Sequence, residues 1–154
     1  MSEFDDRPRL VRIADYQFGS GVGEELFAGH CRVERSKSGR PRQVHASDGR
    51  LVSLGQDGRF TLGIEGGRRL IEIGSPPENS VIVGDESEPF VREGKNVFAK
   101  FVFRVGSEIR PGDEVCVVHR EGGLLAVGRA ELPASAMLDF ETGMAVKVRE
   151  GIED

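Results

Sequence analysis

Residues 88–100 read Glu-Pro-Phe-Val-Arg-Glu-Gly-Lys-Asn-Val-Phe-Ala-Lys, and this stretch decides the fold of the second half of the chain. Pro89 suits the first turn of a helix, where its missing N–H costs nothing, and Gly94 is the residue type that most often ends a helix. We therefore expect a helix over residues 87–93. Alternation from 96 to 104 then predicts one long strand. One face of that strand would carry Val97, Ala99, Phe101 and Phe103, and the other Phe98, Lys100 and Arg104.

Outward from this stretch, short apolar runs are separated by glycine-rich corners. Strands are predicted over residues 81–83, 114–119, 124–130 and 144–149, and a second helix over 133–140. The order β-α-β-β-β-α-β, with glycine at almost every corner, predicts a small, strongly curved sheet or partly closed barrel with two helices beside it.

The first half of the chain is separated from this barrel by a break over residues 74–80, where consecutive prolines stop both helix and central strand. We place a domain boundary there, giving domains 1–75 and 76–154. The first domain is expected to open with a helix that Asp6 caps and Gly19 ends. A helical turn over 24–27, strands over 31–35, 42–46, 50–54 and 59–64, and a helix over 66–73 follow. The fold class is therefore α+β: a small N-terminal α+β domain packed on a C-terminal β pseudobarrel with two helices.

Composition excludes several classes of protein. A chain of 154 residues is too short for a (β/α)8 barrel of about 250 residues, and it contains no apolar run near the ~18 residues of a membrane span. The acidic, polar start lacks the layout of a signal peptide, so a cytoplasmic protein that does not contact membranes is expected. Cys31 and Cys116 stand far apart without the ligand spacing of a zinc site, so no metal is expected.

Catalysis is not expected either, because the chain has neither a nucleophile elbow nor a zinc-binding helix pattern. We interpret it as a binding protein without catalytic residues or cofactors. Its formal charge of −5 is uneven: residues 1–75 carry 12 Lys and Arg against 11 Asp and Glu, and residues 76–154 carry 9 against 15. Local basic patches within a screening length of about 8–10 Å, and not the mean charge, decide whether phosphate is bound.

The second half of the chain resembles a PUA domain. The resemblance is carried by residues 88–100, 109–115, 125–130 and 143–148. PUA domains are RNA-binding pseudobarrels found on pseudouridine synthases and archaeosine transglycosylases, so the resemblance implies RNA binding. Two positions depart from the family pattern: Gly84 stands where Asp is usual, and Pro133 where Ser or Thr often caps the second helix.

The first half resembles the domain that precedes PUA in archaeal tRNA-guanine transglycosylases. The matching stretches are residues 13–19, 36–40 and 57–62. Together the two resemblances cover about residues 9 to 150. The catalytic barrel of those enzymes has no counterpart in this sequence, so none of their chemistry is carried over.

The resemblance places an RNA groove at the junction of helix, Gly94 and strand. It implies contacts from Gly94 itself and from Arg92, Lys95, Asn96 and Lys100. Glycine permits close approach of backbone, while lysine and the asparagine amide can meet phosphate or sugar oxygens. The alternative interpretation is a helix end followed by solvated charges.

Two further basic groups are candidate RNA contacts. On the last strand, Met144, Val146 and Val148 alternate with Ala145, Lys147 and Arg149, which would turn a basic face toward an RNA backbone; Arg129 is an additional candidate. The densest basic stretch is a secondary candidate on a hairpin of the first domain: Arg32, Arg35, Lys37, Arg40 and Arg42. In both cases the alternative is a solvent-exposed face whose charges only keep the protein soluble.

We therefore expect an RNA-binding protein that recognises structured RNA, with tRNA the leading candidate, in the context of tRNA modification. The alternative is an accessory subunit that binds a separate, transglycosylase-like catalytic chain through protein contacts, with the acidic helix around Glu86 and Glu88 facing that partner.

Overall fold

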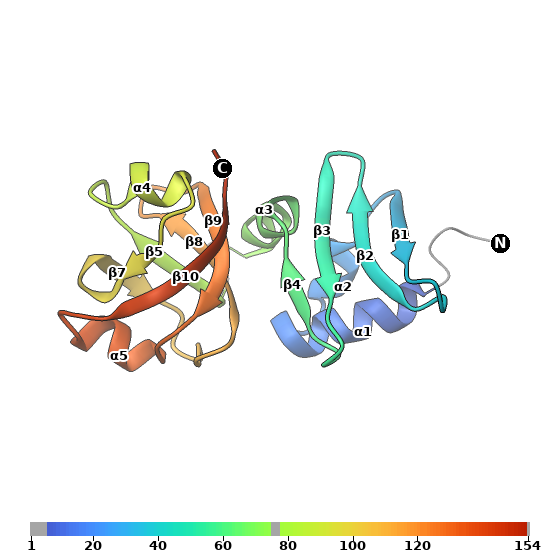
Figure 1. The fold of residues 1–154 in the computed structure, drawn as a ribbon, viewed down its shortest axis with the longest axis horizontal. Helices are drawn as coiled ribbons and strands as arrows, with labels where there is room; N and C mark the ends of the chain where they lie inside the picture. The colour runs from blue at the N-terminus through green and yellow to red at the C-terminus, as the bar shows by residue number, and fades with distance from the viewer. Residues whose placement is uncertain (1–5, 75–77, 154) are drawn as a thin grey trace. The chain divides into compact units, whose positions relative to one another are not determined.

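The computed structural model describes residues 6–74 and 78–153. The chain divides into two compact units between Ile73 and Gly74. The predicted proline break at residues 75–77 lies outside the described residues. Each unit has its own sheet (Figure 1).

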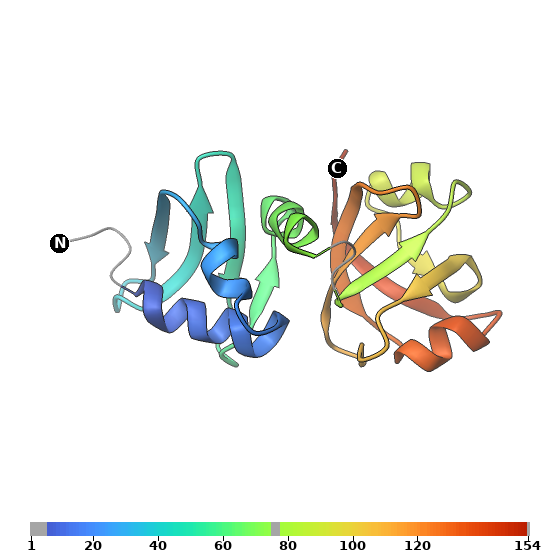
Figure 2. The same ribbon diagram turned by 180° about the vertical axis from the view of Figure 1, so that it is seen from behind.

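The first unit is an antiparallel four-stranded sheet in the order β1-β2-β3-β4, with helices against it. Helices α1 and α2 lie behind the sheet in Figure 1 and in front of it in Figure 2. The elements are α1 (Arg7–Phe18), α2 (Val22–Leu26), β1 (Cys31–Arg35), β2 (Pro41–Ala46), β3 (Gly49–Leu54), β4 (Phe60–Leu62) and α3 (Ile64–Ile73). Its core contains Leu10, Leu26, Phe27, Leu51, Phe60 and Leu62.

Two local predictions for this unit were wrong. Asp6 stands at the start of α1 but makes no side-chain capping bond, because its carboxylate pairs with Arg35 at 2.5 Å. The strand predicted over 59–64 is shorter: the Gly63 N–H donates to the Leu51 carbonyl oxygen at 2.9 Å, and α3 begins at the next residue.

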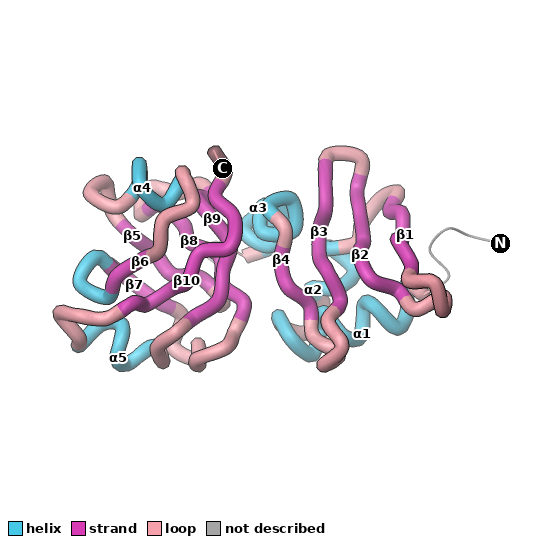
Figure 3. The backbone as a smooth tube through the Cα atoms, viewed as in Figure 1, coloured by secondary structure: helices cyan, strands magenta, loops and turns pink. Residues whose placement is uncertain are grey.

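The second unit is a six-stranded pseudobarrel with the strand order β6-β10-β9-β8-β5-β7 (Figure 3). The elements are β5 (Ser80–Val83), α4 (Glu88–Arg92), β6 (Val97–Phe98), the 3-10 turn η1 (Ala99–Phe101), β7 (Val102–Val105), β8 (Glu114–His119), β9 (Leu124–Ala130), α5 (Ala134–Asp139) and β10 (Met144–Gly151). Because the two end strands, β6 and β7, are joined through η1, the sheet nearly closes on itself. The predicted α+β class and the pseudobarrel are confirmed.

The long strand predicted over residues 96–104 was wrong, since η1 divides it. β6 pairs with β10 and β7 pairs with β5, so the chain changes sheet edge within η1. The expected alternation fails at this corner: Val97 and Ala99 are buried, but Phe103, predicted on the same face, is 55% exposed. The 3-10 turn interrupts the alternation of side chains between the two faces, and the sequence pattern alone does not reveal this interruption.

The interior of the pseudobarrel is apolar. It contains Val81, Val83, Val115, Val117, Leu125 and Val146, together with Val91 from α4 and Met137 from α5. α5 has no capping side chain, because Pro133 precedes it, and the Ala134 N–H instead donates to the Ile109 carbonyl oxygen at 3.0 Å. Among the described residues, no helix is long and apolar enough to cross a membrane.

Candidate nucleic-acid interface

The shoulder, which we define as residues 92–96, is shaped by the way α4 ends. Gly94 has a φ of 100°, in the left-handed region that favours glycine. The Lys95 N–H donates to the Phe90 carbonyl oxygen at 3.0 Å, and the Gly94 N–H donates to Val91 at 2.9 Å, which together make a Schellman motif. The motif turns the chain sharply and leaves the Lys95 side chain exposed.

The shoulder is fixed against the last strand. The Asn96 Oδ1 accepts a hydrogen bond from the Val148 N–H at 2.9 Å. Gly151 is packed so closely that a Cβ there would meet the Arg92 carbonyl oxygen at 2.4 Å. These contacts place Lys95 and Asn96 beside β10 and unite the two predicted groups of contacts into one surface. Because the Asn96 side-chain oxygen accepts this bond, its NH2 group is the part of the amide that can donate to a ligand, and the predicted RNA contact of Asn96 stays a prediction.

The β10 cluster consists of three cations and two carboxylates: Arg129, Lys147, Arg149, Glu114 and Glu131. Lys147 lies directly opposite Arg129 on β9, and Arg129 lies opposite Glu114 on β8. Arg129 pairs with Glu131 at 3.0 Å. Arg149 follows Val148 at a bulge and makes two bonds to Glu114, at 2.5 and 3.2 Å. The Glu114 side chain is only 6% exposed, so this bidentate pair is partly desolvated.

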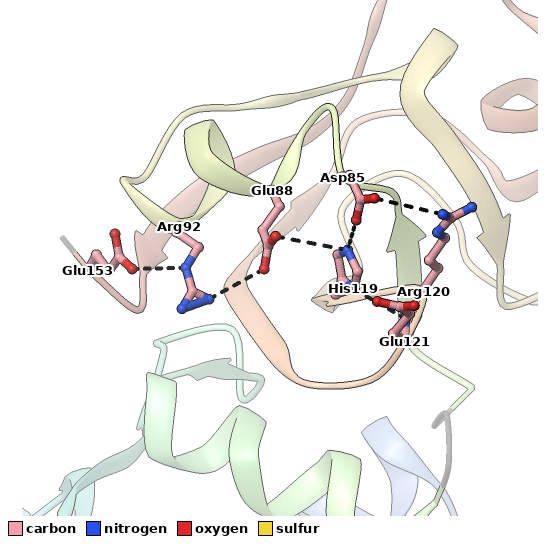
Figure 4. A network of polar contacts seen from close by, with 7 residues as sticks. All are labelled: Asp85, Glu88, Arg92, His119, Arg120, Glu121 and Glu153. Carbon is pink, nitrogen blue, oxygen red and sulfur yellow. Dashed lines mark hydrogen bonds and ion pairs between the residues drawn. The ribbon is translucent and has the colours of Figure 1, made fainter.

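The predicted cations therefore fall into two kinds. Arg92 bonds to Glu153 at 2.8 Å and lies 3.6 Å from Glu88, so its guanidinium holds the helix end and the C-terminal segment together (Figure 4). Lys95 and Lys147 are exposed, and within the part of the chain that the structure describes neither has an ion pair. These two lysines are the cations of the surface with the fewest internal partners.

Lys100 belongs neither to the shoulder nor to the β10 cluster. It stands on η1 with its ammonium 5.0 Å from the centre of the Phe101 ring. Beside it is a hollow of about 460 Å³ that the sequence did not predict. The hollow is lined by Gly84, Asp85, Glu86, Ser87, Lys100, Phe101, Val102, Phe103 and Arg120. The hollow was missed at the level of sequence because alternation placed Phe103 on the same strand face as the buried Val97 and Ala99. The Gly-Gly turn that follows Arg120 was a signal that this arginine lies at a loop.

A polar network joins the start of α4 to the turn between β8 and β9 (Figure 4). Asp85, His119 and Glu121 offer ligand atoms within 4.8 Å of one another, which is close enough for a metal ion. However, the His119 Nδ1 accepts a hydrogen bond from the Glu121 N–H at 3.2 Å, so the proton of the neutral ring is on Nε2. That N–H donates to the Asp85 carboxylate at 2.6 Å and is not available as a ligand. The arrangement is a hydrogen-bond network and does not have the donor set of a metal site.

The secondary basic patch of the first unit is divided in the same way. Arg35 pairs with Asp6 and donates to the Gly39 carbonyl oxygen at 3.0 Å, and Arg40 donates to the Gly55 carbonyl oxygen at 2.5 Å. Both arginines shape the hairpins of the unit. The remaining candidates are exposed: Arg32, Lys37 and Arg42.

Both cysteines are buried thiols. Burial raises the pKa of Cys116 to about 12, and burial also raises the pKa of Cys31. A thiol with a raised pKa is a poor nucleophile near neutral pH.

Comparison with known proteins finds a match for each half of the chain. Residues 8–77 match the patch-forming domain C2 of tRNA-guanine transglycosylase, and residues 79–152 match the PUA domain. The first half of the chain is therefore similar to a C2 domain and the second half to a PUA domain, in the order that the resemblance predicted. A conserved PUA domain protein from Thermoplasma acidophilum has the same fold, with a TM-score of 0.66 at 20% identity, covering 100% of this chain and 93% of that one.

More specifically, the chain is similar to the C-terminal region of archaeal tRNA-guanine(15) transglycosylases. It is 44% identical over 151 residues to the protein from Methanobrevibacter smithii, covering 97% of this chain and 23% of that protein. To the protein from Pyrococcus furiosus it is 47% identical over 146 residues, covering 94% and 25%. The chain thus spans about a quarter of the length of these relatives and matches their non-catalytic part.

Proposed function

We propose that this protein binds tRNA through the surface formed by the shoulder and the β10 cluster. The observation that carries the proposal is the placement of Lys147 directly opposite Arg129 on neighbouring strands. Like charges opposed in this way disfavour the sheet. Glu131 pairs with Arg129, but Lys147 has no ion pair among the described residues, so an external anion beside Lys147 would reduce the remaining penalty. The backbone phosphate of an RNA is the anion that the domain type suggests.

The surface is suited to backbone recognition more than to reading bases. Its exposed donors are lysine ammonium groups, which meet phosphates as point charges, and the NH2 group of Asn96, which can reach a sugar or phosphate oxygen. Double-stranded RNA is recognised mainly by shape and by such backbone contacts. We therefore propose affinity for folded tRNA with little preference for sequence.

The relatives support a role in tRNA modification. Proteins named as tRNA-guanine(15) transglycosylases share the C2 and PUA regions, and this chain matches only that non-catalytic quarter. We propose that the chain contributes RNA binding to a modification reaction whose catalytic groups belong to another region or another chain.

The second candidate function is that of an accessory subunit that binds a catalytic chain. Exposed apolar side chains at the end of α5 favour it, since Leu138 on the helix is 55% exposed and Phe140, directly after the helix, is 51% exposed. Affinity purification from a native extract separates the two functions: bulk tRNA without a protein partner supports the first, and a stable catalytic chain without tRNA supports the second.

The direct test is titration of a tRNA transcript with the protein. With about 4–6 phosphates neutralised, the log–log dependence of the association constant on salt should have a slope of about −4 to −5. The double variant Lys95→Ala/Lys147→Ala should bind more weakly and with a shallower slope. Arg104→Ala is the matched control, because Arg104 is an exposed cation of β7 outside this surface. Equal loss in the control and the double variant would overturn the proposal.

A further inference from the structure

We propose that the hollow beside η1 binds one unstacked nucleotide of an RNA, with the base on Phe103 and the phosphate at Lys100. This inference rests on the proposed function, and it adds a second contact on different elements from the shoulder and β10. The hollow is formed by the segment between β5 and α4, by η1 with the start of β7, and by Arg120. Its volume of about 460 Å³ falls within the range of small-ligand sites.

The base would be held by an aromatic platform. Phe103 lies on β7, an end strand of the sheet, and more than half of its side chain is exposed. The Arg120 guanidinium lies 6.0 Å from the centre of its ring. Exposed aromatic rings and arginine planes are the surfaces on which proteins stack unpaired bases, and such stacking tolerates any base because each has a π-face.

The charges of the hollow select a ligand that has both a base and a phosphate. Two cations, Lys100 and Arg120, are balanced by two carboxylates, Asp85 and Glu86. Asp85 is engaged by the His119 Nε2–H at 2.6 Å and by Arg120 at 3.8 Å. Inorganic phosphate alone gains little at a site whose formal charge sums to zero, so stacking must supply part of the affinity. Lys100 carries no ion pair among the described residues and is an exposed residue, with its ammonium 5.0 Å from the centre of the Phe101 ring, so it is the cation that we assign to the phosphate.

Hydrogen bonds within the protein hold the side chains at one side of the hollow in place without a ligand. The Glu121 N–H orients His119, and His119 in turn holds Asp85 beside Arg120 (Figure 4). The site is therefore largely formed in advance, which lowers the entropic cost of ordering it on binding.

The test is titration of the ¹⁵N-labelled full chain with 5′-AMP, followed by amide chemical shifts. We expect saturable shifts at residues 84–87, 100–103 and 120, and no such shifts with inorganic phosphate. Phe103→Ala should weaken 5′-AMP binding by about fivefold or more, the lower end of what stacking contributes. Phe140→Ala is the matched control, since Phe140 is similarly exposed but lies outside the hollow.

Three results would overturn the inference: shifts confined to other residues, equal shifts with inorganic phosphate, or equal weakening by both phenylalanine variants. Removing an exposed side chain should leave the spectrum of Phe103→Ala dispersed; if it does not, Arg120→Ala and Lys100→Ala take its place. The 5′-AMP titration is independent of the tRNA titration. Normal tRNA binding without 5′-AMP binding at the hollow would refute this inference and leave the proposed function standing.

Discussion

Lys147→Ala should flatten the salt dependence of tRNA binding by about the value of one phosphate contact. Each neutralised phosphate contributes about 0.7 to 0.9 to the log–log slope. Lys147 is exposed and has no ion pair among the residues described, so it would release a full counterion on binding. Over a fourfold increase in salt, one such contact corresponds to about a threefold change in association constant. Stability should change by less than about 0.5 kcal/mol, because the side chain supports nothing else.

Arg149→Ala should have the opposite profile, although Arg149 lies on the same strand. Its guanidinium already shares its charge with Glu114 through two hydrogen bonds, so it has less to contribute to an RNA phosphate. Removal would leave a carboxylate that is only 6% exposed without its main partner. Breaking a buried pair costs about 3–5 kcal/mol, and the 35% exposure of Arg149 reduces the expected loss to about 1–3 kcal/mol.

The assay is fluorescence anisotropy with a labelled tRNA transcript from about 50 to about 200 mM salt, the range over which phosphate contacts dominate affinity. Denaturant unfolding of each variant supplies the stability arm, and Arg104→Ala is the control cation. The reasoning is refuted if Lys147→Ala keeps the wild-type slope, or if Arg149→Ala changes the slope more than Lys147→Ala and leaves stability unchanged.

Three further variants test how the second unit is built. Gly151→Ala should lower the Tm of the unit by about 4 °C or more, since a Cβ would meet the Arg92 carbonyl oxygen at 2.4 Å; an unchanged melting curve by circular dichroism contradicts that packing. Asn96→Ala should cost about 1 kcal/mol and weaken tRNA binding, whereas Asn96→Asp, which retains an acceptor for the Val148 N–H, should keep most of the stability measured by denaturant unfolding. Burial raises the pKa of Cys116 from 9.0 to about 12, so above pH 9 the unfolded chain loses a proton that the folded chain keeps, and stability should fall by about 1.4 kcal/mol per pH unit between these values. Unfolding at pH 8 and pH 10 measures that fall, and an equal fall in Cys116→Ala would assign it to other groups.

Local signals in the sequence were enough to place most elements. The strands β8 and β9 have the predicted bounds, because glycine-containing turns precede β8 and separate it from β9, and Pro133 follows shortly after the end of β9. The end of α4 at Gly94 was predictable for the same reason, since few other residues adopt its φ of 100°. Where a residue type is demanded by local backbone geometry, a single sequence reveals the structure.

The corner at η1 was not predictable, because its cause is non-local. Residues 96–104 alternate as a strand would, and nothing within them marks the change of partner from β10 to β5. The break follows from closing the sheet: the Ala99 N–H donates to the Gly143 carbonyl oxygen, 44 positions further along the chain, at 2.9 Å. An alternating pattern predicts which side chains would share a face of a strand, but it does not predict where the pairing with a neighbouring strand ends.

The candidate site was predictable in residue type but not in the state of each cation. The sequence identifies Lys147 and Arg149 as neighbours on one basic strand. Which of them is engaged depends on Glu114, 35 positions away from Arg149, and on a bulge that directs the arginine toward it. Both features depend on how β10 is paired with its neighbouring strands, and the residue spacing within β10 does not reveal that pairing.

The acidic balance of the chain and a phosphate-binding surface are compatible because carboxylates and arginines are placed together. Glu114 pairs with Arg149 and Glu153 pairs with Arg92, so these two carboxylates form internal pairs that fix the shape of the surface. Lysine, a flexible point charge without a planar fork, is left for the solvent side at Lys147. Replacing Lys147 by arginine keeps the formal charge, and whichever of the two arginines then bonds to Glu114, the other is left without that carboxylate. The salt slope should therefore stay close to that of the wild type, and a clearly shallower slope would mean that the position of the unpaired cation, and not only its charge, determines binding.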